Sequence, residues 1–437
     1  MAGPAAGTAG SPRTLADWLD YQQSLHPRGI ELGLERVREV WQRLGAARPA
    51  PVVITVAGTN GKGSTVAFLE AMLGEEGLRT GCYTSPHLLR YNERVRIDAV
   101  DTDDAELIEA FERIEAARGG IALTWFEFGT LAALLVFAQA GLDVAVLEVG
   151  LGGRLDAVNI VDADAAIVTT IGLDHEEWLG AGIERIAVEK AGIFRAGRVA
   201  VIGDASAAAT LQSAAASIGA RAIVAGVDYR VSASTRGWRW SRGDECLELP
   251  PPRLRAPCQV ANAAAAIAAL DALRDRLPWQ PEAIARAVAS ACVAARLQRF
   301  RDRAELVIDV AHNPQAARVL AEALADDPVD GQNIAVFAAL ADKDIAGIVA
   351  ALRADFPRWY LAGLDAETPR GLDAATLRGR VGDLLQEHEV SLHADVAEAL
   401  AAARRDGLHA DRIVAFGSFF VAAVALAVAR DDGLEEM

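Results

Sequence analysis

A short apolar strand that runs into a glycine-rich loop and a helix constrains this fold more than any other part of the chain. Residues 52–65 read VVITVAGTNGKGST, and an apolar helix is predicted to follow from Val66 to Leu73. Glycines let a backbone wrap a phosphate chain, and the free N–H groups of a helix start attract anions. Lys62 adds a positive charge, and Ser64 or Thr65 can reach a metal. The pattern predicts a phosphate-binding βα unit.

This loop departs from the strict Walker pattern. Val56 stands where that pattern has its first glycine, and Gly63 follows the lysine. An ordinary glycine turn at a strand end is the alternative interpretation. The flanking strand and helix favour the phosphate site.

Composition restricts the class of protein. The chain has 437 residues, 52% of them hydrophobic, and a formal net charge of −17. This composition excludes a disordered chain, and the length predicts two or three domains. No cluster of Lys and Arg is present, so nonspecific binding to nucleic acid is not expected.

The sequence also indicates a compartment. The scattered cysteines form no CxxC pair, which predicts neither a zinc site nor a disulfide framework and fits a reducing cytosol: Cys82, Cys246, Cys258 and Cys292. Met1–Ser11 has no basic flank or apolar stretch and is interpreted as a disordered tail rather than a signal peptide. The charge-free run Ile413–Ala429 is interrupted by Gly417, which favours a buried strand, a turn and a helix over a membrane span. We expect a cytoplasmic protein without a membrane partner.

From Pro51 onward, apolar runs alternate with helical stretches, which predicts a parallel sheet covered on both faces. The predicted strands are Val52–Ala57, Val144–Val149, Ala165–Thr170, Val199–Ile202, Leu306–Val310, Ile334–Ala338 and Ile413–Phe416. A helix is predicted at Val260–Leu273, and alternating residues in Asp228–Pro257 predict a small antiparallel excursion. A boundary near Arg296–Arg301 divides the chain into domains 1–297 and 298–437. Functional residues are expected in the loops at the carboxyl ends of the strands.

Candidate residues do follow these strands. Glu148 ends one of them, and a carboxylate beside a phosphate loop can hold Mg²⁺. His175 has acidic neighbours and is either a metal ligand or an ordinary core or surface histidine. Lys190 is either functional or a helix lysine whose stem lies along apolar surface. Asp309 and His312 follow a strand of the second half.

The loop Asp342-Lys343-Asp344 raises a different class, the GTPases. Asp342 stands where the guanine-binding motif has Asn or Thr, and no DxxG switch is present. The sequence therefore disfavours this interpretation.

Taken together, several ordered motifs resemble the Mur-ligase superfamily, and specifically the folylpolyglutamate synthase/dihydrofolate synthase family, from about Thr14 to Ser418. The motifs are GTNGKGS at Gly58, SPHL at Ser85, WFEFGT at Trp125, EVGLGGRLDAVN at Glu148, IGLDH at Ile171, EKAGI at Glu189, DVAHNP at Asp309 and ADKD at Ala341. The resemblance implies an α/β fold with a P-loop Mur-ligase-type central domain, whose sheet is parallel-rich, and a smaller Rossmann-like C-terminal domain.

The resemblance also implies a reaction. ATP phosphorylates a substrate carboxylate to an acyl phosphate, and the amine of L-glutamate then displaces phosphate. The implied substrates are dihydropteroate and the γ-carboxyl of reduced folates, as in bifunctional bacterial members. Two Mg²⁺ ions and a monovalent cation such as K⁺ are implied, and a monomer is the default because two domains of one chain complete the site.

Site residues are implied in the same way. The ATP phosphates would be held by Asn60, Gly61, Lys62, Gly63 and Ser64. Adenine, phosphate and ribose would be held from the interdomain side by Asn262, Arg296 and Asp309. The implied metal ligands are Ser64, Ser85, Glu148, His175 and Lys190. The implied catalytic residues are Lys190, as an N6-carboxylated side chain, and His312, which would orient the acyl phosphate.

For the pterin, the segments similar to the bifunctional members are Thr124, Trp125, Phe126 and Glu127, and Leu155, Asp156 and Ala157. Asp156 would hydrogen-bond the amino-pyrimidine edge. The stretches 15–19, 26–27 and 31–37 also look like the bifunctional type. A plainer interpretation of the first is one face of an amphipathic helix, formed by Leu15, Trp18, Leu19 and Gln22.

One departure concerns the interdomain motif, where the family usually has glycine before the arginine and this chain has Ala295 before Arg296. Alanine tolerates a positive φ poorly, so we expect altered hinge or nucleotide geometry there. Three alternatives stay open: a folylpolyglutamate synthase without the first activity, a ligase for a nucleotide-linked cell-wall peptide, and a nonenzymatic nucleotide switch. About fifty residues precede the phosphate loop, whereas the cell-wall ligases have an additional N-terminal domain.

Overall fold

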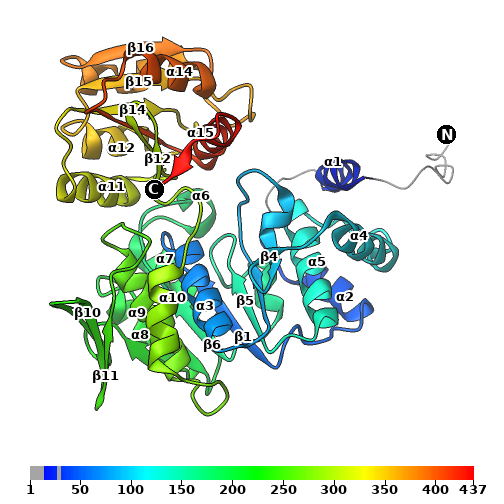
Figure 1. The fold of residues 1–437 in the computed structure, drawn as a ribbon. Coiled ribbons are helices and arrows are strands. Elements are labelled where there is room, and N and C mark those ends of the chain that lie inside the picture. The colour runs from blue at the N-terminus through cyan, green and yellow to red at the C-terminus, as the bar shows by residue number, and fades with distance from the viewer. Residues whose placement is uncertain (1–13, 27–30) are drawn as a thin grey trace, which may run out of the picture.

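The computed structural model describes residues 14–26 and 31–437. The predicted tail at Met1–Ser11 and Pro27 of the 26–27 stretch lie outside the described residues. Two α/β domains follow one another along the chain, each a sheet with helices on both faces (Figure 1). The predicted fold class is confirmed.

The first sheet has eight strands in the order β4-β3-β2-β5-β1-β6-β7-β8. In chain order they are β1 (Val52–Ala57), β2 (Thr80–Tyr83), β3 (Val95–Ile97), β4 (Val100–Asp101), β5 (Val144–Glu148), β6 (Ala165–Val168), β7 (Val199–Ile202) and β8 (Arg221–Val224). The six strands β2, β5, β1, β6, β7 and β8 are parallel to one another. Strands β3 and β4 add an antiparallel edge beside β2. Strand β1 is therefore central, which places the loop that follows it in the middle of the sheet edge.

Alternation along β1 fills both layers. Val52, Ile54 and Val56 pack in one buried cluster, and Val53 and Ala57 pack in the other, because successive side chains of a strand point to opposite faces. The first layer contains α3 (Lys62–Glu75), α9 (Gln259–Asp271) and α10 (Pro281–Ser290). The second contains α1 (Leu15–Leu25), α2 (Glu35–Arg43), α4 (Asp104–Arg118), α5 (Trp125–Ala140), α7 (Ile183–Ala191) and α8 (Ala208–Ile218).

The predicted antiparallel excursion is present as a three-stranded sheet of β9 (Arg230–Ser234), β10 (Gly237–Arg242) and β11 (Glu245–Leu249). The predicted amphipathic helix is α1, which buries Trp18 and Gln22. The predicted helix at 260–273 is α9.

The second sheet has seven strands in the order β16-β15-β14-β17-β13-β12-β18. They are β12 (Gln298–Arg301), β13 (Glu305–Ile308), β14 (Asn333–Phe337), β15 (Arg358–Ala362), β16 (Glu389–His393), β17 (Arg412–Phe416) and β18 (Glu435–Glu436). One face is covered by α11 (Pro314–Asp326), α12 (Ile345–Leu352) and α13 (Ala374–Val381), and the other by α14 (Val396–Asp406) and α15 (Phe419–Asp431). The boundary after residue 297 stays a prediction.

Several predicted strands were too long at their carboxyl ends. Strand β6 ends at Val168 rather than Thr170, because the two threonine side chains that follow bind the phosphate loop. Val149, Val310 and Ala338 also lie beyond their strands. Short strands and edge strands such as β3, β4, β16 and β18 were not predicted, since their residues alternate poorly and are partly exposed.

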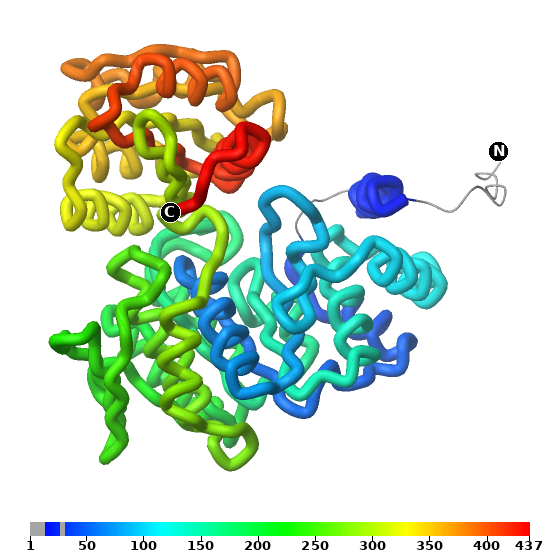
Figure 2. Tube along the Cα trace, in the orientation of Figure 1, coloured from blue at the N-terminus to red at the C-terminus, as the bar shows by residue number. Residues whose placement is uncertain are grey.

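The second domain, coloured yellow to red, stands over the end of the first sheet beside α6 (Glu176–Leu179) (Figure 2). Among the described residues, no helix combines the length and apolar character needed to cross a membrane. The charge-free run 413–429 divides into β17 and the first part of α15, as predicted.

Candidate active site

The loop between β1 and α3 has a backbone that only glycine fits at two positions. Gly61 is the N-cap of α3 with φ +85°, and a Cβ there would lie 2.5 Å from the Asn262 side-chain oxygen. Gly58 has φ +155°, and a Cβ there would lie 1.8 Å from Thr169 Oγ1. The loop thus exposes backbone N–H groups at the start of a helix, as phosphate binding requires.

Two threonines after β6 hold this loop from the neighbouring strand. Thr169 Oγ1 donates to the Asn60 carbonyl at 2.6 Å, and Thr170 Oγ1 donates to the same carbonyl at 3.1 Å. The Thr59 amide donates to the Thr170 carbonyl at 2.7 Å. The loop is therefore shaped by β6 as well as by its own glycines, a role that the sequence analysis missed when it assigned both threonines to the strand.

Two lysine amines converge on one carbonyl of the loop. Lys62 Nζ donates to the Gly58 carbonyl at 3.1 Å and to that of Thr59 at 3.3 Å. Lys190 Nζ, from α7, donates to the same Gly58 carbonyl at 3.0 Å. Burial lowers the pKa of Lys62. Burial, aided by the nearby Lys62 charge, lowers the pKa of Lys190 to about 7.

A carboxylate and two serines lie beside the loop where a divalent cation was predicted. Glu148, at the end of β5, is buried and accepts a hydrogen bond from the Ser85 amide at 3.1 Å. A Cβ on Gly63 would lie 3.8 Å from Glu148 Oε2, so the loop and the carboxylate are neighbours. Ser64 is buried and accepts a hydrogen bond from Gln259 Nε2 at 3.3 Å. Burial raises the pKa of Glu148, which a cation would oppose.

These groups fit a cation that arrives with a nucleotide. In the described part of the chain, no group of three or more His, Cys, Asp or Glu side chains could hold a metal by itself. Mg²⁺ commonly takes one or two carboxylates and completes its shell with phosphates and waters. One buried carboxylate with nearby hydroxyls matches that donor set.

His175 and Asp174 follow β6 and face the second domain. His175 has φ +55° at the N-terminus of α6, and burial lowers its pKa to about 4, so the ring is neutral and able to bind a metal. Asp174 accepts a hydrogen bond from Lys343 Nζ at 2.7 Å and lies 3.6 Å from His312 Nε2. Burial would raise the pKa of Asp174, but the neighbouring His312 ring and the Lys343 charge hold it well below its usual range.

The loop after β13 reaches the phosphate loop directly. Asn60 donates to Gln315 Oε1 at 2.7 Å and exchanges hydrogen bonds with Asn313 at 3.2 and 3.0 Å. His312 Nδ1 lies 2.8 Å from the Val310 carbonyl. The second domain therefore contacts the first on the loop that carries the predicted phosphate ligands.

The predicted nucleotide residues lie around the domain junction. Asn262 donates to Gln259, which in turn bonds Ser64. A Cβ on Gly63 would lie 3.9 Å from a terminal nitrogen of Arg296, so this guanidinium is next to the phosphate loop. The guanidinium carbon is 5.4 Å from the centre of the Phe419 ring. Asp309 accepts the Leu297 and Ala311 amides at 2.9 and 2.8 Å. Burial lowers the pKa of Arg296 and raises the pKa of Asp309.

Ala295, before the arginine at which altered hinge or nucleotide geometry was predicted, adopts a left-handed backbone. It has φ +55° and is fully buried, and Leu297 two residues later has φ +49°. Both values lie where a Cβ is strained. The chain thus enters the second domain through a strained turn.

The predicted pterin segments form a separate corner beside β5. Thr124 is the N-cap of α5. The Glu127 carboxylate accepts hydrogen bonds from the Thr124 amide at 2.8 Å and from the Arg36 guanidinium at 3.0 Å. Phe126 covers Gly150, where a Cβ would meet its ring at 2.4 Å. Trp125 lies beneath Arg94 at 4.5 Å.

The second pterin segment centres on a buried carboxyl group. Asp156 accepts the Leu151 and Val158 amides at 2.8 and 3.1 Å, while Leu155 is half-buried and Ala157 is buried. Burial raises the pKa of Asp156 to about 7. These contacts place the group, and its pterin role stays a prediction.

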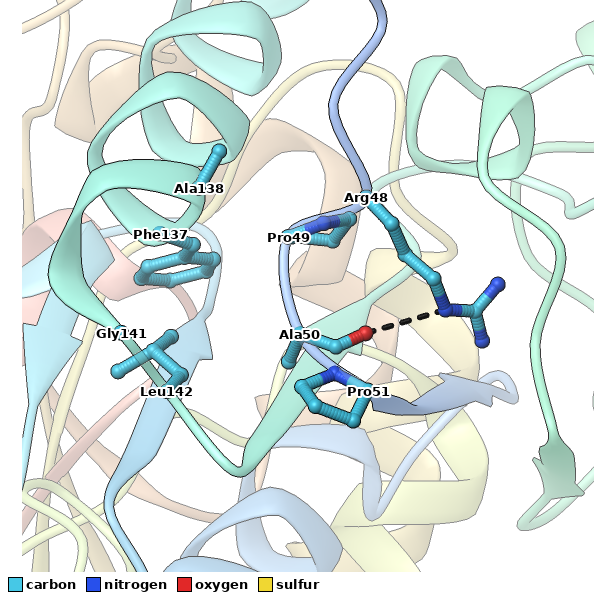
Figure 3. Close-up of a pocket in the computed structure, with 8 residues that line it drawn as sticks. All are labelled: Arg48, Pro49, Ala50, Pro51, Phe137, Ala138, Gly141 and Leu142. Atoms are coloured by element: carbon cyan, nitrogen blue, oxygen red, sulfur yellow. Dashed lines mark hydrogen bonds between the residues drawn. The ribbon is translucent and has the colours of Figure 1, made fainter.

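A small apolar pocket of about 360 Å³ lies elsewhere, between the segment before β1 and the end of α5 (Figure 3). Phe137 and Leu142 face Pro49 and Pro51 across it, and Arg48 Nε turns back to the Ala50 carbonyl at 3.0 Å. It is at the opposite end of β1 from the phosphate loop and contains none of the predicted site residues.

Lys343 and Asp174 are site residues to which the sequence analysis gave no role, although both stood in quoted motifs. A count of residue types could have found Lys343. The chain has three lysines, Lys62, Lys190 and Lys343, and all its other basic side chains are arginine. Each of the three lies at this site.

A phosphate loop, an adjacent buried carboxylate and a second α/β domain docked over them define a Mur-type ATP-dependent ligase. Residues 56–270 match the Mur ligase middle domain, and residues 295–419 match the domain described as Mur ligase, glutamate ligase domain. The chain is 44% identical over 421 residues to the dihydrofolate synthase/folylpolyglutamate synthase of Escherichia coli (strain K12), with 96% of each chain covered.

Solved structures agree. "E.coli FolC in complex with DHPP and ADP" matches with a TM-score of 0.90 at 44% identity, covering 96% of this chain and 98% of that one. A bifunctional folylpolyglutamate synthase/dihydrofolate synthase with Mn, AMPPNP and L-glutamate bound matches with a TM-score of 0.87 at 45% identity and the same coverage. The chain belongs to the dihydrofolate synthase/folylpolyglutamate synthase family of Mur ligases, and the resemblance noted in its motifs is confirmed.

Proposed function

We propose that this ligase joins L-glutamate to dihydropteroate, forming dihydrofolate, and to the γ-carboxyl of reduced folates, forming folylpolyglutamates. Family membership supports the substrates, since the relatives above are named for both activities. The observation that carries the mechanism is the contact of Asn313, Gln315 and Lys343 with Asn60 and Asp174, which closes the second domain over the phosphate loop.

The reaction has two steps. The substrate carboxylate attacks the γ-phosphorus of ATP, giving an acyl phosphate and ADP. The amine of L-glutamate then attacks the acyl carbon, and inorganic phosphate leaves as the amide forms. Both steps need positioning and charge neutralisation rather than a protein nucleophile, which suits a site built from loop N–H groups and lysines.

The phosphate loop supplies the first of these needs. The backbone at Asn60, Gly61 and Gly63 and the Lys62 ammonium hold the ATP phosphates. Asn262, Arg296 and Asp309 hold adenine, phosphate and ribose from the junction between the domains. A divalent cation, taken to be Mg²⁺, neutralises the transferring phosphoryl group when bound by Ser64, Ser85, Glu148 and His175. A second Mg²⁺ and K⁺ are parts of the same proposal.

Lys190 acts as a carbamate in this proposal. A neutral amine and CO₂ combine to form the carbamate and release one proton, and burial gives Lys190 a pKa of about 7, which leaves a large neutral fraction at neutral pH. The resulting anion would bind metal beside Lys62, where an ammonium could not. His312, held near Asp174, orients the acyl phosphate for attack.

The acid substrate is held at the corner formed by α5 and the loop after β5. Asp156 accepts hydrogen bonds from the amino-pyrimidine edge, and the neighbouring side chains shape the pocket: Thr124, Trp125, Phe126, Glu127, Leu155 and Ala157. We further propose a monomeric cytoplasmic enzyme of two domains, 1–297 and 298–437, with small-molecule substrates and neither nucleic-acid nor membrane partners.

Mass spectrometry of the products tests the proposal. The protein is incubated with ATP, Mg²⁺ and L-glutamate, together with dihydropteroate in one reaction and a reduced folate in another. Dihydrofolate and stoichiometric ADP in the first reaction, and added glutamates in the second, are expected. Product in the second alone would reduce the function to folylpolyglutamate synthase, and glutamate-independent ADP release in both would contradict ligation.

A further inference from the structure

Three arginines lie within residues 90–96, and they differ in whether a carboxylate pairs with them. Arg90 is exposed and pairs with Asp104 at 3.3 Å. Arg96 pairs with Glu70 at 2.8 Å, and both side chains are largely buried. Arg94, between them in the 3₁₀ turn Tyr91–Arg94, is only 6% exposed.

Arg94 has no carboxylate partner in the part of the chain that the structure describes. Residues 1–13 and 27–30 contain no Asp or Glu either. The nearest acidic neighbour in sequence, Glu93, uses its carboxylate to accept the amides of Leu88, Leu89 and Arg90. The Arg94 charge is therefore not balanced by the protein.

The groups that do contact Arg94 are neutral. Its Nε donates to His87 Nδ1 at 2.8 Å, so this ring nitrogen carries no proton and the imidazole is neutral. The guanidinium carbon lies 4.5 Å from the Trp125 ring centre and 5.6 Å from that of Tyr91. Aromatic faces attract a cation but do not neutralise it. A buried charge without a counter-ion is costly, which points to an anion that arrives from outside.

The position of Arg94 indicates which anion would bind to it. His87 and Ser85 belong to one loop, and the Ser85 amide is bonded to Glu148 beside the phosphate loop. On the other side, Trp125 belongs to the segment proposed for the pterin. The Tyr83 ring centre lies 6.0 Å from that of Phe126. Burial raises the pKa of the Tyr83 hydroxyl, the Arg94 charge lowers it and the Asp156 charge raises it, so both charged groups lie near this hydroxyl. Arg94 thus contacts both the loop that carries Ser85 and a residue of the pterin corner.

We propose that the Arg94 guanidinium binds a carboxylate of the acid substrate and so determines specificity for pteroate-type acids over their neutral analogues. This inference rests on the proposed function. Arginine has five N–H donors in a planar fork that matches a carboxylate, and one of them is used by His87. Its stacking on Trp125 holds the fork in place before the ligand binds.

Calorimetric titration with two ligands tests this assignment. Pteroate and its carboxamide, which differ only at the carboxyl group, anionic in the first and neutral in the second, are titrated into wild-type protein, Arg94→Gln and Arg94→Lys, with Arg90→Gln as the matched surface control. Wild-type protein and Arg90→Gln should bind pteroate about tenfold or more tightly than the amide, as a charged hydrogen bond implies. Arg94→Gln should bind the two ligands equally while retaining affinity for the amide, and Arg94→Lys should restore part of the preference.

The results that would overturn the inference differ in what they mean for the proposed function. If Arg94→Gln keeps the wild-type preference, or weakens both ligands equally in a protein with an unchanged melting temperature, Arg94 is a packing residue and the proposed function stands. If wild-type protein binds neither ligand, the proposed substrate fails together with the role of Arg94. The KM for L-glutamate, measured in parallel, should be unchanged in Arg94→Gln, since a rise confined to glutamate would assign the guanidinium to the other carboxylate.

Discussion

Lys343 of the second domain and Asp174 of the first form an ion pair across the domain junction, with 2.7 Å between Nζ and Oδ1. Both side chains are nearly buried, at 6% and 10% exposure. Because Asp174 also lies 3.6 Å from His312, the pair fixes the position of His312 relative to the phosphate loop. Domain closure and placement of His312 are therefore coupled through one carboxylate.

Replacing Lys343 should uncouple them. We expect Lys343→Met to lower kcat about 10²-fold, because small displacements of a positioned group have effects of that size, while the affinity for an ATP analogue changes little. Arg301→Ala removes an exposed pair with Glu435 and should leave both quantities unchanged. A loss of nucleotide affinity as large as the loss of kcat would assign Lys343 to ATP binding instead.

Ala295 should be a site of stored strain. Its φ of +55° is unfavourable for alanine by about 1–2 kcal/mol, so Ala295→Gly is expected to raise the free energy of unfolding by about 1 kcal/mol after the entropy of glycine is included. Ala401→Gly, at an exposed helical position, should lower it by about 1 kcal/mol. Urea denaturation measures both, and equal destabilisation by the two changes would contradict the strain.

Lys190 should titrate near neutrality. With three lysines in the chain, protein labelled with ¹³C at lysine Cε gives three signals, and the one missing in Lys190→Met identifies the residue. We expect that signal to titrate at about pH 7, because burial favours the neutral amine. Since this value is below that of the unfolded chain, the contribution of Lys190 to stability rises as pH increases from about 7 to about 10.

Carboxylation of Lys190 provides a separate prediction. Added ¹³C-bicarbonate should produce a carbamate signal that increases from pH 6 to pH 8, as the neutral amine becomes available. Lys190→Ala should abolish this signal and sharply reduce turnover while the fold is retained. Near-normal turnover in Lys190→Ala would exclude the carbamate role.

Asp156 should make pterin binding depend on pH. Burial raises its pKa to about 7, so the carboxylate that we propose as the acceptor of hydrogen bonds from the pterin becomes available as pH rises. The KM for dihydropteroate should fall between pH 6 and pH 8, and Asp156→Asn should remove this dependence, unlike the exposed control Asp104→Asn. Because the native value exceeds 3.8, the contribution of Asp156 to stability falls as pH rises from about 4 to about 7 and is constant above that.

The predicted candidate residues came from one physical regularity. Strands β1, β5 and β6 of the first sheet are parallel, so the loops after them meet at one edge. The residues at and just after the ends of the predicted strands therefore include the candidates of the first domain: the phosphate loop, Glu148 and His175. The three lysines meet at the same edge: Lys62 and Lys190 contact the loop after β1, and Lys343 reaches Asp174 after β6.

The sequence by itself thus determined the alternation of strands and helices and the glycine-rich turn between β1 and α3, because these depend on local pattern and backbone geometry. The tertiary structure alone decided which charges have partners. Lys343 meets Asp174 across 169 residues of chain, whereas Arg94 meets no carboxylate among residues 14–26 and 31–437 although Glu93 is adjacent. Pairing depends on burial and on the direction of each side chain, and neither is specified by distance along the sequence.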